Sequence, residues 1–366
     1  MQFKRLPPAV ACAVAWEVVC SATRSIARSV TRSATCLVKR VTRSVACLVA
    51  CSVACLVALM PAGTALAQGY PARPVRIVVP FAAGSGTDIV ARITAEELSK
   101  GLGGSFVVDN KPGASAQIAA EFVAKAAPDG YTLFLTTNTS HSANPFLFKK
   151  LSYDPIKDFT PIGRTIFLPF TLVVDPKLPI RNVSELVAAA KAQPGKLSYA
   201  YGNSTGQVAG ATLSHMAKID TIAVPYKSTP PAMTDIIGGS VAYMFVDFAA
   251  GRAQMQAGKL RPIAVSTEKR SALLPEIPSV AETPGFAGFD LTSWGGMLGP
   301  AGLPKEIVDK LNAELKKIYA RPDVRERLVP IGAEPSTSSP EEMAEFLRVQ
   351  LQSWGRKIKD AGIQPE

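Results

Sequence analysis

The sequence predicts an α/β protein made of two α/β lobes with a ligand cleft between them, preceded by a separate N-terminal segment. From residue 70 onward, short apolar and β-branched runs alternate with stretches of helical periodicity, which is typical of a largely parallel sheet with helices on its faces. The alternation runs through one unit and then begins again near residue 171. Two successive units of this kind predict two lobes, with ligands held outside the carboxyl ends of the strands.

The first unit has a β-α-β-α-β order. The run VRIVV at 75–79 predicts a buried strand, and Ile89, Ile93 and Leu98 give the next segment a helical period. Pro-Gly and Pro-Asp-Gly sequences bound a second helix. The expected strands are 75–79, 106–108 and 131–136, and the expected helices are 88–102 and 114–126.

The second unit repeats this order and is followed by two C-terminal helices. Asn182 with Glu185 predicts one helix start, Thr229 another, and Ser339-Pro340-Glu341-Glu342 is a capping box with proline at the first helical position. The expected strands are 171–174, 197–201, 221–224, 241–246 and 263–265. The expected helices are 183–192, 207–218, 231–237, 249–257, 305–319 and 340–361.

The first 67 residues have the features of an export signal. They hold eight Lys or Arg, one acid and all six cysteines, and an apolar run at 45–60 is followed by Ala65-Leu66-Ala67. A basic region, an apolar core and an A-x-A site predict a cleavable signal peptide, with cleavage after Ala67 and a periplasmic mature protein. A lipoprotein-like box ending at Cys51 and a basic membrane segment upstream of the apolar run stay open as alternatives, as does a start site placed too far upstream.

The composition of the remaining chain argues against several classes of protein. Beyond residue 67 there are 32 basic and 28 acidic residues, so a basic surface for nucleic acid is not expected. This part has no cysteine and only His141 and His215, which excludes a cysteine nucleophile and disfavours a metal site or cofactor. Without a G-x-S-x-G motif an enzyme is not expected, and a hydrolase is the weaker alternative.

Four loops lie where the carboxyl ends of the strands are expected: 80–88, 137–146, 202–207 and 247–251. The first, PFAAGSGTD, joins a strand to a helix with two glycines, so its amides and the helix N-terminus can bind an anion. No P-loop lysine follows, which favours a carboxylate over a nucleotide phosphate. The alternative is a plain turn in which Asp88 only complements the helix dipole.

Several longer blocks resemble one known family. VRIVVPFAAGSGTDIVAR, DNKPGASAQIAAEFVAKAAPDGYTL, YDPIKDFTPI, VPYKSTPPAMTDIIGGSVAYMF and SWGGMLGPAGLPKEIVDKLNAEL occur in this order. They resemble the Bug family, the TctC-like periplasmic receptors of tripartite tricarboxylate transporters. The resemblance implies a type II periplasmic-binding fold, with lobe 1 at 68–170 and 295–366, lobe 2 at 171–294, and 1–67 as the N-terminal extension with the signal peptide.

The resemblance also implies a function and a set of site residues. It implies a monomeric receptor that binds a small carboxylate without a cofactor and delivers it to a membrane permease, or alternatively signals to a sensor kinase. The implied ligand-binding residues are Phe81, Ala83, Gly84, Ser85, Gly86, Thr87, Asp88, Thr137, Asn138, His141, Ser204, Thr205, Gly206 and Asp247. Asp247 is displaced by one residue from the acid of the family pattern, so the direction of its side chain stays open.

Overall fold

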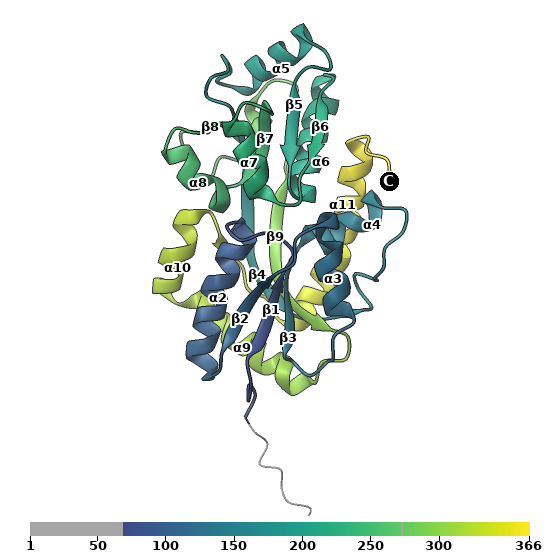
Figure 1. The fold of residues 1–366 in the computed structure, drawn as a ribbon, viewed down its shortest axis with the longest axis vertical. Helices are drawn as coiled ribbons and strands as arrows, with labels where there is room; N and C mark the ends of the chain where they lie inside the picture. The colour runs from purple at the N-terminus through teal and green to yellow at the C-terminus, as the bar shows by residue number, and fades with distance from the viewer. Residues whose placement is uncertain (1–68, 272–273) are drawn as a thin grey trace, which may run out of the picture. The chain divides into compact units, whose positions relative to one another are not determined.

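The structure is a computed structural model, and it describes residues 69–271 and 274–366. The expected signal peptide, its cleavage site and the lipoprotein-like Cys51 lie outside these residues. Residues 69–366 form one compact unit (Figure 1). Among the described helices, none combines the length and apolar character that a membrane span requires.

The first sheet is built around β1 (Val75–Val79), which lies between the parallel strands β2 (Phe106–Asn110) and β3 (Thr132–Thr137). β3 pairs in antiparallel fashion with β9 (Thr292–Pro300), and β9 pairs with the first part of β4 (Phe159–Val174). A two-residue strand, β10 (Glu334–Pro335), adds to β4. The expected β-α-β-α-β unit is therefore confirmed, and two antiparallel strands extend it.

The second sheet begins where β4 leaves the first. The last residues of β4 pair with β7 (Tyr243–Asp247) and β8 (Arg261–Val265), both antiparallel to it. β5 (Ser198–Tyr201) lies parallel between β7 and β6 (Ile222–Pro225). Because β4 belongs to both sheets and β9 runs beside it, these two strands connect the two lobes in Figure 1.

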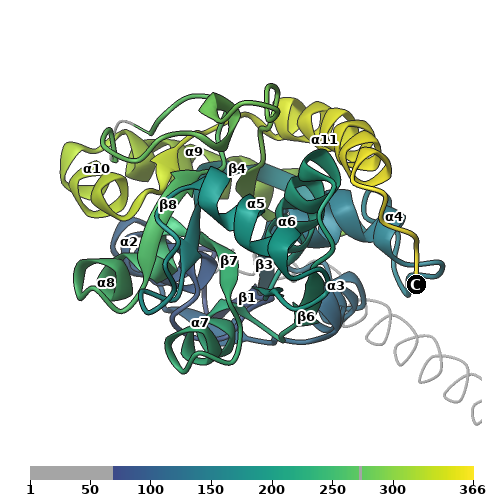
Figure 2. The same ribbon diagram turned by 90° about the horizontal axis from the view of Figure 1, so that it is seen from above.

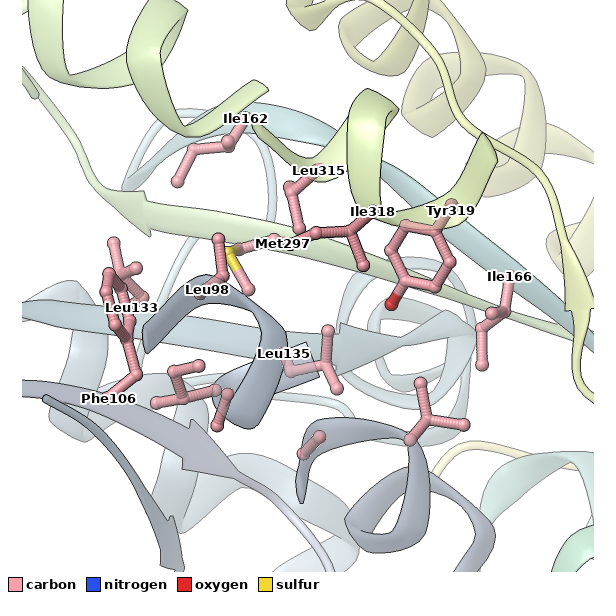
Figure 3. Packing of buried hydrophobic residues seen from close by; sticks show 14 of the residues in the cluster. Leu98, Phe106, Leu133, Leu135, Ile162, Ile166, Met297, Leu315, Ile318 and Tyr319 are labelled. Carbon is pink, nitrogen blue, oxygen red and sulfur yellow. The ribbon is translucent and has the colours of Figure 1, made fainter. Parts of the chain in front are cut away.

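The first lobe has a packed core on each face of its sheet. Successive residues of β1 point to opposite faces, so Ile77 and Val78 enter different clusters. On one face lie α2 (Gly86–Leu102), α9 (Lys305–Ala320) and α10 (Pro322–Leu328). Figure 3 shows this core, where Leu98, Leu315 and Tyr319 meet strand residues such as Leu133 and Met297. The other face holds α3 (Gln117–Ala124) and the first half of α11 (Pro340–Asp360).

The second lobe is covered in the same way. α5 (Val183–Ala192) and α6 (Ser204–Ala217) pack on one face, and α7 (Thr229–Ile237) and α8 (Phe248–Gln256) on the other. The second half of α11 joins the α5–α6 face through Trp354 and Ile358, so this helix contacts the cores of both lobes. Figure 2 shows α11 running beside α6 and α4 (Asn144–Leu147). The lobe boundaries drawn from the sequence stay a prediction.

Local signals placed most helices within a few residues. The caps at Asn182 and Ser339 are confirmed, since each side chain accepts the expected backbone N–H. Two expectations were wrong. Ala114–Ala116 have positive φ and form a separate turn, so α3 begins only at Gln117. Ser228, not Thr229, occupies the N-cap position of α7, and Thr229 is the first helical residue.

Candidate ligand cleft

A small cavity lies between the two lobes, at the carboxyl ends of the strands. Its volume is about 10 Å³, which is the space of roughly one water molecule. The lining residues come from both lobes and from the connecting strands. They are Phe81, Ser85, Thr87, Thr137, Thr139, Leu168, Phe170, Asn203, Thr229, Asp247 and Ser293.

Four helix N-termini converge on this cavity. Ser85 is the N-cap of α2, Asn203 is the N-cap of α6, and Asp247 is the N-cap of α8. Thr229 opens α7. Each helix N-terminus carries a partial positive charge of about half an elementary charge, so together they favour an anion. The cavity is therefore suited to a carboxylate, although its lining includes no cationic side chain from residues 69–271 or 274–366.

Direct hydrogen bonds join the lobes beside the cavity. The Asn138 amide nitrogen donates to Ser204 Oγ at 3.2 Å and Thr205 Oγ1 at 3.0 Å, and its oxygen accepts from Ser293 Oγ at 2.6 Å. Ser204 Oγ donates to Thr139 Oγ1 at 3.0 Å. These hydroxyl and amide groups are buried, so each lobe satisfies polar groups of the other.

A second set of contacts joins the loop before α2 and the first turn of α2 to the N-termini of α7 and α8. The backbone N–H of Ala82 donates to Ser228 Oγ at 3.1 Å. Gly86, in the first turn of α2, lies against the carboxylate of Asp247, and a Cβ built on Gly86 would come within 2.1 Å of Asp247 Oδ1. A side chain larger than hydrogen at this position would therefore hold the lobes apart.

Among the described residues that line the cavity, Asp247 is the one with a charged side chain. Its Oδ1 accepts the N–H of Ala250 at 2.9 Å, and its Oδ2 accepts from Thr229 Oγ1 at 3.4 Å. The side chain is buried, and desolvation raises the pKa of its carboxyl above the ordinary value. The orientation that the sequence left open is thus toward the cavity.

The structure divides the residues expected from the sequence into three groups. Phe81, Ser85, Thr87, Thr137 and Asp247 line the cavity. Asn138, Ser204 and Thr205 form the hydrogen bonds between the lobes. The remaining residues lie outside the lining, and they are Ala83, Gly84, Gly86, Asp88, His141 and Gly206. The role of every residue in the three groups as a ligand contact stays a prediction.

Three residues of the last group have their polar atoms engaged elsewhere. The Asp88 carboxylate accepts hydrogen bonds from Gly84 N at 2.9 Å, from Arg92 and from Asn110. These bonds hold the conformation of the loop at 80–88. The Gly206 N–H donates to Asn203 Oδ1 at 2.9 Å, as part of the cap of α6. This amide is therefore already used in the structure.

His141 belongs to the core. Its ring packs edge-on against Phe159 with centroids 4.6 Å apart, and Nδ1 lies 3.0 Å from Thr136 Oγ1. Complete burial lowers the pKa of His141 to about 3, so the imidazole is neutral near neutral pH. No cluster of three or more His, Cys, Asp or Glu side chains that could hold a metal occurs in the part of the chain that the structure describes.

Six lining residues were not named as ligand contacts from the sequence. Thr139 and Asn203 lie in two of the loops expected at the carboxyl ends of the strands, and Thr229 was expected only to cap a helix. Leu168, Phe170 and Ser293 lie on β4 and β9, within the pair of strands that connects the lobes. Most of β4 and all of β9 were missing from the expected strands, so no local signal marked these three.

This chain is similar to known proteins in sequence and in fold. A protein of Bordetella bronchiseptica is 39% identical over 310 residues, 82% of this chain and 89% of that protein. An R. palustris structure solved with adipate is 35% identical, with a TM-score of 0.79, over 81% of this chain and 100% of that chain. The structure of the periplasmic binding protein BugD is 36% identical, with a TM-score of 0.77 and the same coverage.

A family model extends the match along most of the chain. The model described as "Tripartite tricarboxylate transporter family receptor" matches residues 90–363. The resemblance to Bug proteins and the two-lobe fold expected from the sequence are confirmed. This chain, with its cleft between two α/β lobes, belongs to the tripartite tricarboxylate transporter receptor family.

Proposed function

We propose that the protein is a periplasmic solute receptor that closes its two lobes around a small organic carboxylate and delivers it to a membrane transporter of the tripartite tricarboxylate type. The observation that carries the proposal is the convergence of four helix N-termini from both lobes on one polar cavity. The adipate in the R. palustris relative supports a carboxylate as the class of ligand.

Binding requires the lobes to open and close. The cavity between the lobes has a volume of about 10 Å³, so a carboxylate enters the cleft, and is held in it, with the lobes further apart than in this structure. Once inside, it contacts groups of both lobes and stabilises an arrangement in which they are closed around it, which shifts the population toward that state. Closure also removes water from the cleft, which strengthens each hydrogen bond to the ligand.

Neutral donors suit this role because they avoid the cost of burying cationic side chains. The hydroxyls of Thr87, Thr137 and Thr139 and the amide of Asn203 line the cavity. Thr87 stands in the first turn of α2, where the helix dipole adds to the attraction of an anion. The closed form then presents one surface formed by both lobes, and this is the form that we propose the transporter recognises.

A calorimetric titration tests the carboxylate function. The full-length protein is expressed with its N-terminal segment, purified from the periplasmic fraction, and titrated with mono-, di- and tricarboxylates of three to six carbons. A ligand present at 100 times its Kd adds about 2.7 kcal/mol of stability and raises the midpoint of thermal unfolding. We expect at least one member of the series to bind.

A pair of isosteric variants places the binding in the cleft. Thr87→Val removes a hydroxyl from the lining, and Thr234→Val removes one from the exposed side of α7. The first should weaken binding of the ligand found in the titration by about 5- to 10-fold, which corresponds to one hydrogen bond, and the second should leave it unchanged. Equal affinities of both variants and the wild type would place the ligand elsewhere.

A further inference from the structure

Asp247 is the only charged side chain among the described residues that line the cleft. The other lining groups are hydroxyls, one amide and apolar side chains. In a buried cleft, the charge of the wall decides the charge of the ligand, because water no longer screens the two from each other. The charge of this one carboxylate therefore has the largest effect on which ligand charge the cleft favours.

The carboxylate is fixed in place by groups that also favour its charged form. The Ala250 N–H at the start of α8 and the Thr229 hydroxyl oppose the desolvation that raises its pKa. The carboxylate caps α8 by accepting the N–H of Ala250. It also accepts a hydrogen bond from the hydroxyl of Thr229, and Thr229 is buried as well. Turning the side chain away from the cleft would break the cap of α8 and leave buried donors without partners, which is costly. A ligand in the closed cleft thus meets the carboxylate where it is.

The position of Asp247 affects the main anion-binding feature of the cleft. Because Gly86 has no side chain, the carboxylate reaches the first turn of α2, where a ligand carboxylate would otherwise be held best. No Lys, Arg or His among the described residues lines the cavity and could offset a second negative charge. Arg92, one turn further along α2, pairs with Asp88 outside the lining.

We propose that Asp247 is a specificity-determining residue that makes the cleft select carboxylates with a single negative charge. This inference rests on the proposed function. The preferred ligand directs its carboxylate to the hydroxyls and helix N-termini and turns a hydrogen-bond donor, such as an amide, hydroxyl or ammonium group, toward Asp247. A dicarboxylate would instead place a second anion beside a buried carboxylate.

The size of the discrimination depends on the distance between the two charges. At an effective dielectric constant of about 20, like charges held roughly 6–7 Å apart would disfavour the dianion by on the order of 10- to 100-fold. Removing the charge of Asp247 without changing its shape should abolish this factor. Asp247→Asn does so, and asparagine is as good an N-cap as aspartate, so α8 keeps its cap.

The experiment compares matched ligands that differ in one charge. Full-length wild type and Asp247→Asn are titrated at pH 7.5 with malonate, succinate, glutarate and adipate and with the mono-amide of each. Wild type should bind the mono-amide of the best-fitting length at least 10-fold more tightly than the diacid, and the variant should bind the two within about threefold. Asp175→Asn is the matched control, because it removes a buried carboxylate from the same lobe outside the cavity and should keep the wild-type ratio.

Each outcome has a distinct meaning. A ratio that favours the diacid in wild type, or one that is the same in wild type and Asp247→Asn, overturns the inference while the carboxylate function stands. If neither protein binds any of these ligands, carboxylate binding itself fails and the inference fails with it. Should Asp247→Asn not fold, Asp247→Ser provides the same test with another good N-cap residue.

Discussion

Replacing Gly86 with alanine should weaken the closure of the two lobes without lowering the stability of the fold. The added Cβ would lie 2.1 Å from Asp247 Oδ1, 2.8 Å from its Cγ and 3.2 Å from the Cβ of Ala249. All three atoms belong to the other lobe. The lobes must move apart by about 1.3 Å before the first contact reaches 3.4 Å, an ordinary van der Waals distance.

The expected cost falls on the closed state. Overpacking of this kind costs about 1–3 kcal/mol, so the closed population relative to the open one should fall roughly 5- to 150-fold. Apparent ligand affinity falls by up to the same factor, because it scales with the fraction of binding-competent protein. The lobes themselves lose no core contact, and alanine favours a helix more than glycine does, so the unfolding midpoint should not drop.

The assay combines binding, stability and shape. Calorimetry with the best carboxylate gives the affinity, thermal unfolding gives the stability, and small-angle scattering with saturating ligand reports the closure. Gly238→Ala is the control, because Gly238 has φ −73° at the end of α7 and a Cβ there meets only ordinary contacts. A Gly86→Ala protein that is folded, compact and binds with wild-type affinity would refute the reasoning.

Three further predictions follow from other contacts. Asn138→Ala should weaken closure by about 1–3 kcal/mol because it removes the buried hydrogen-bond partner of the Thr205 and Ser293 hydroxyls, and scattering should report a more open protein without ligand. Glu97→Gln should cost about 1–3 kcal/mol in urea unfolding, because the buried carboxylate pairs with Lys100, Arg321 and Arg327, yet ligand affinity should not change. Lowering the pH from about 6.5 toward 3 should destabilise the fold through His141, by up to about 1.4 kcal/mol per pH unit. Over this range His141 takes up a proton in the unfolded state but not in the folded state, where its pKa is about 3. His141→Phe should flatten that slope in urea titrations at pH 5 and 7, and an unchanged slope would show that another group is responsible.

Local sequence signals were sufficient for most of the elements. β1 and α5 were expected with the bounds that the structure has, because an apolar β-branched run and an Asn-x-x-Glu cap act within a few residues of chain. The ordered blocks of sequence also established the family, and topology selected the loops that supply most of the cleft. These features depend on short segments of sequence, so they can be predicted without knowing which residues pack against them.

The tertiary structure alone decided how the cleft is completed. β9 and the first part of β4 contain prolines and glycines that argue against strands, yet pairing with each other, with bulges near Gly163 and Arg164, makes them the connection between the lobes. Leu168, Phe170 and Ser293 enter the cavity only through that pairing. Asp247 faces α2 because two distant segments meet there, and Gly86 leaves the space for it. Contacts between residues 161 positions apart depend on packing, which no local pattern specifies.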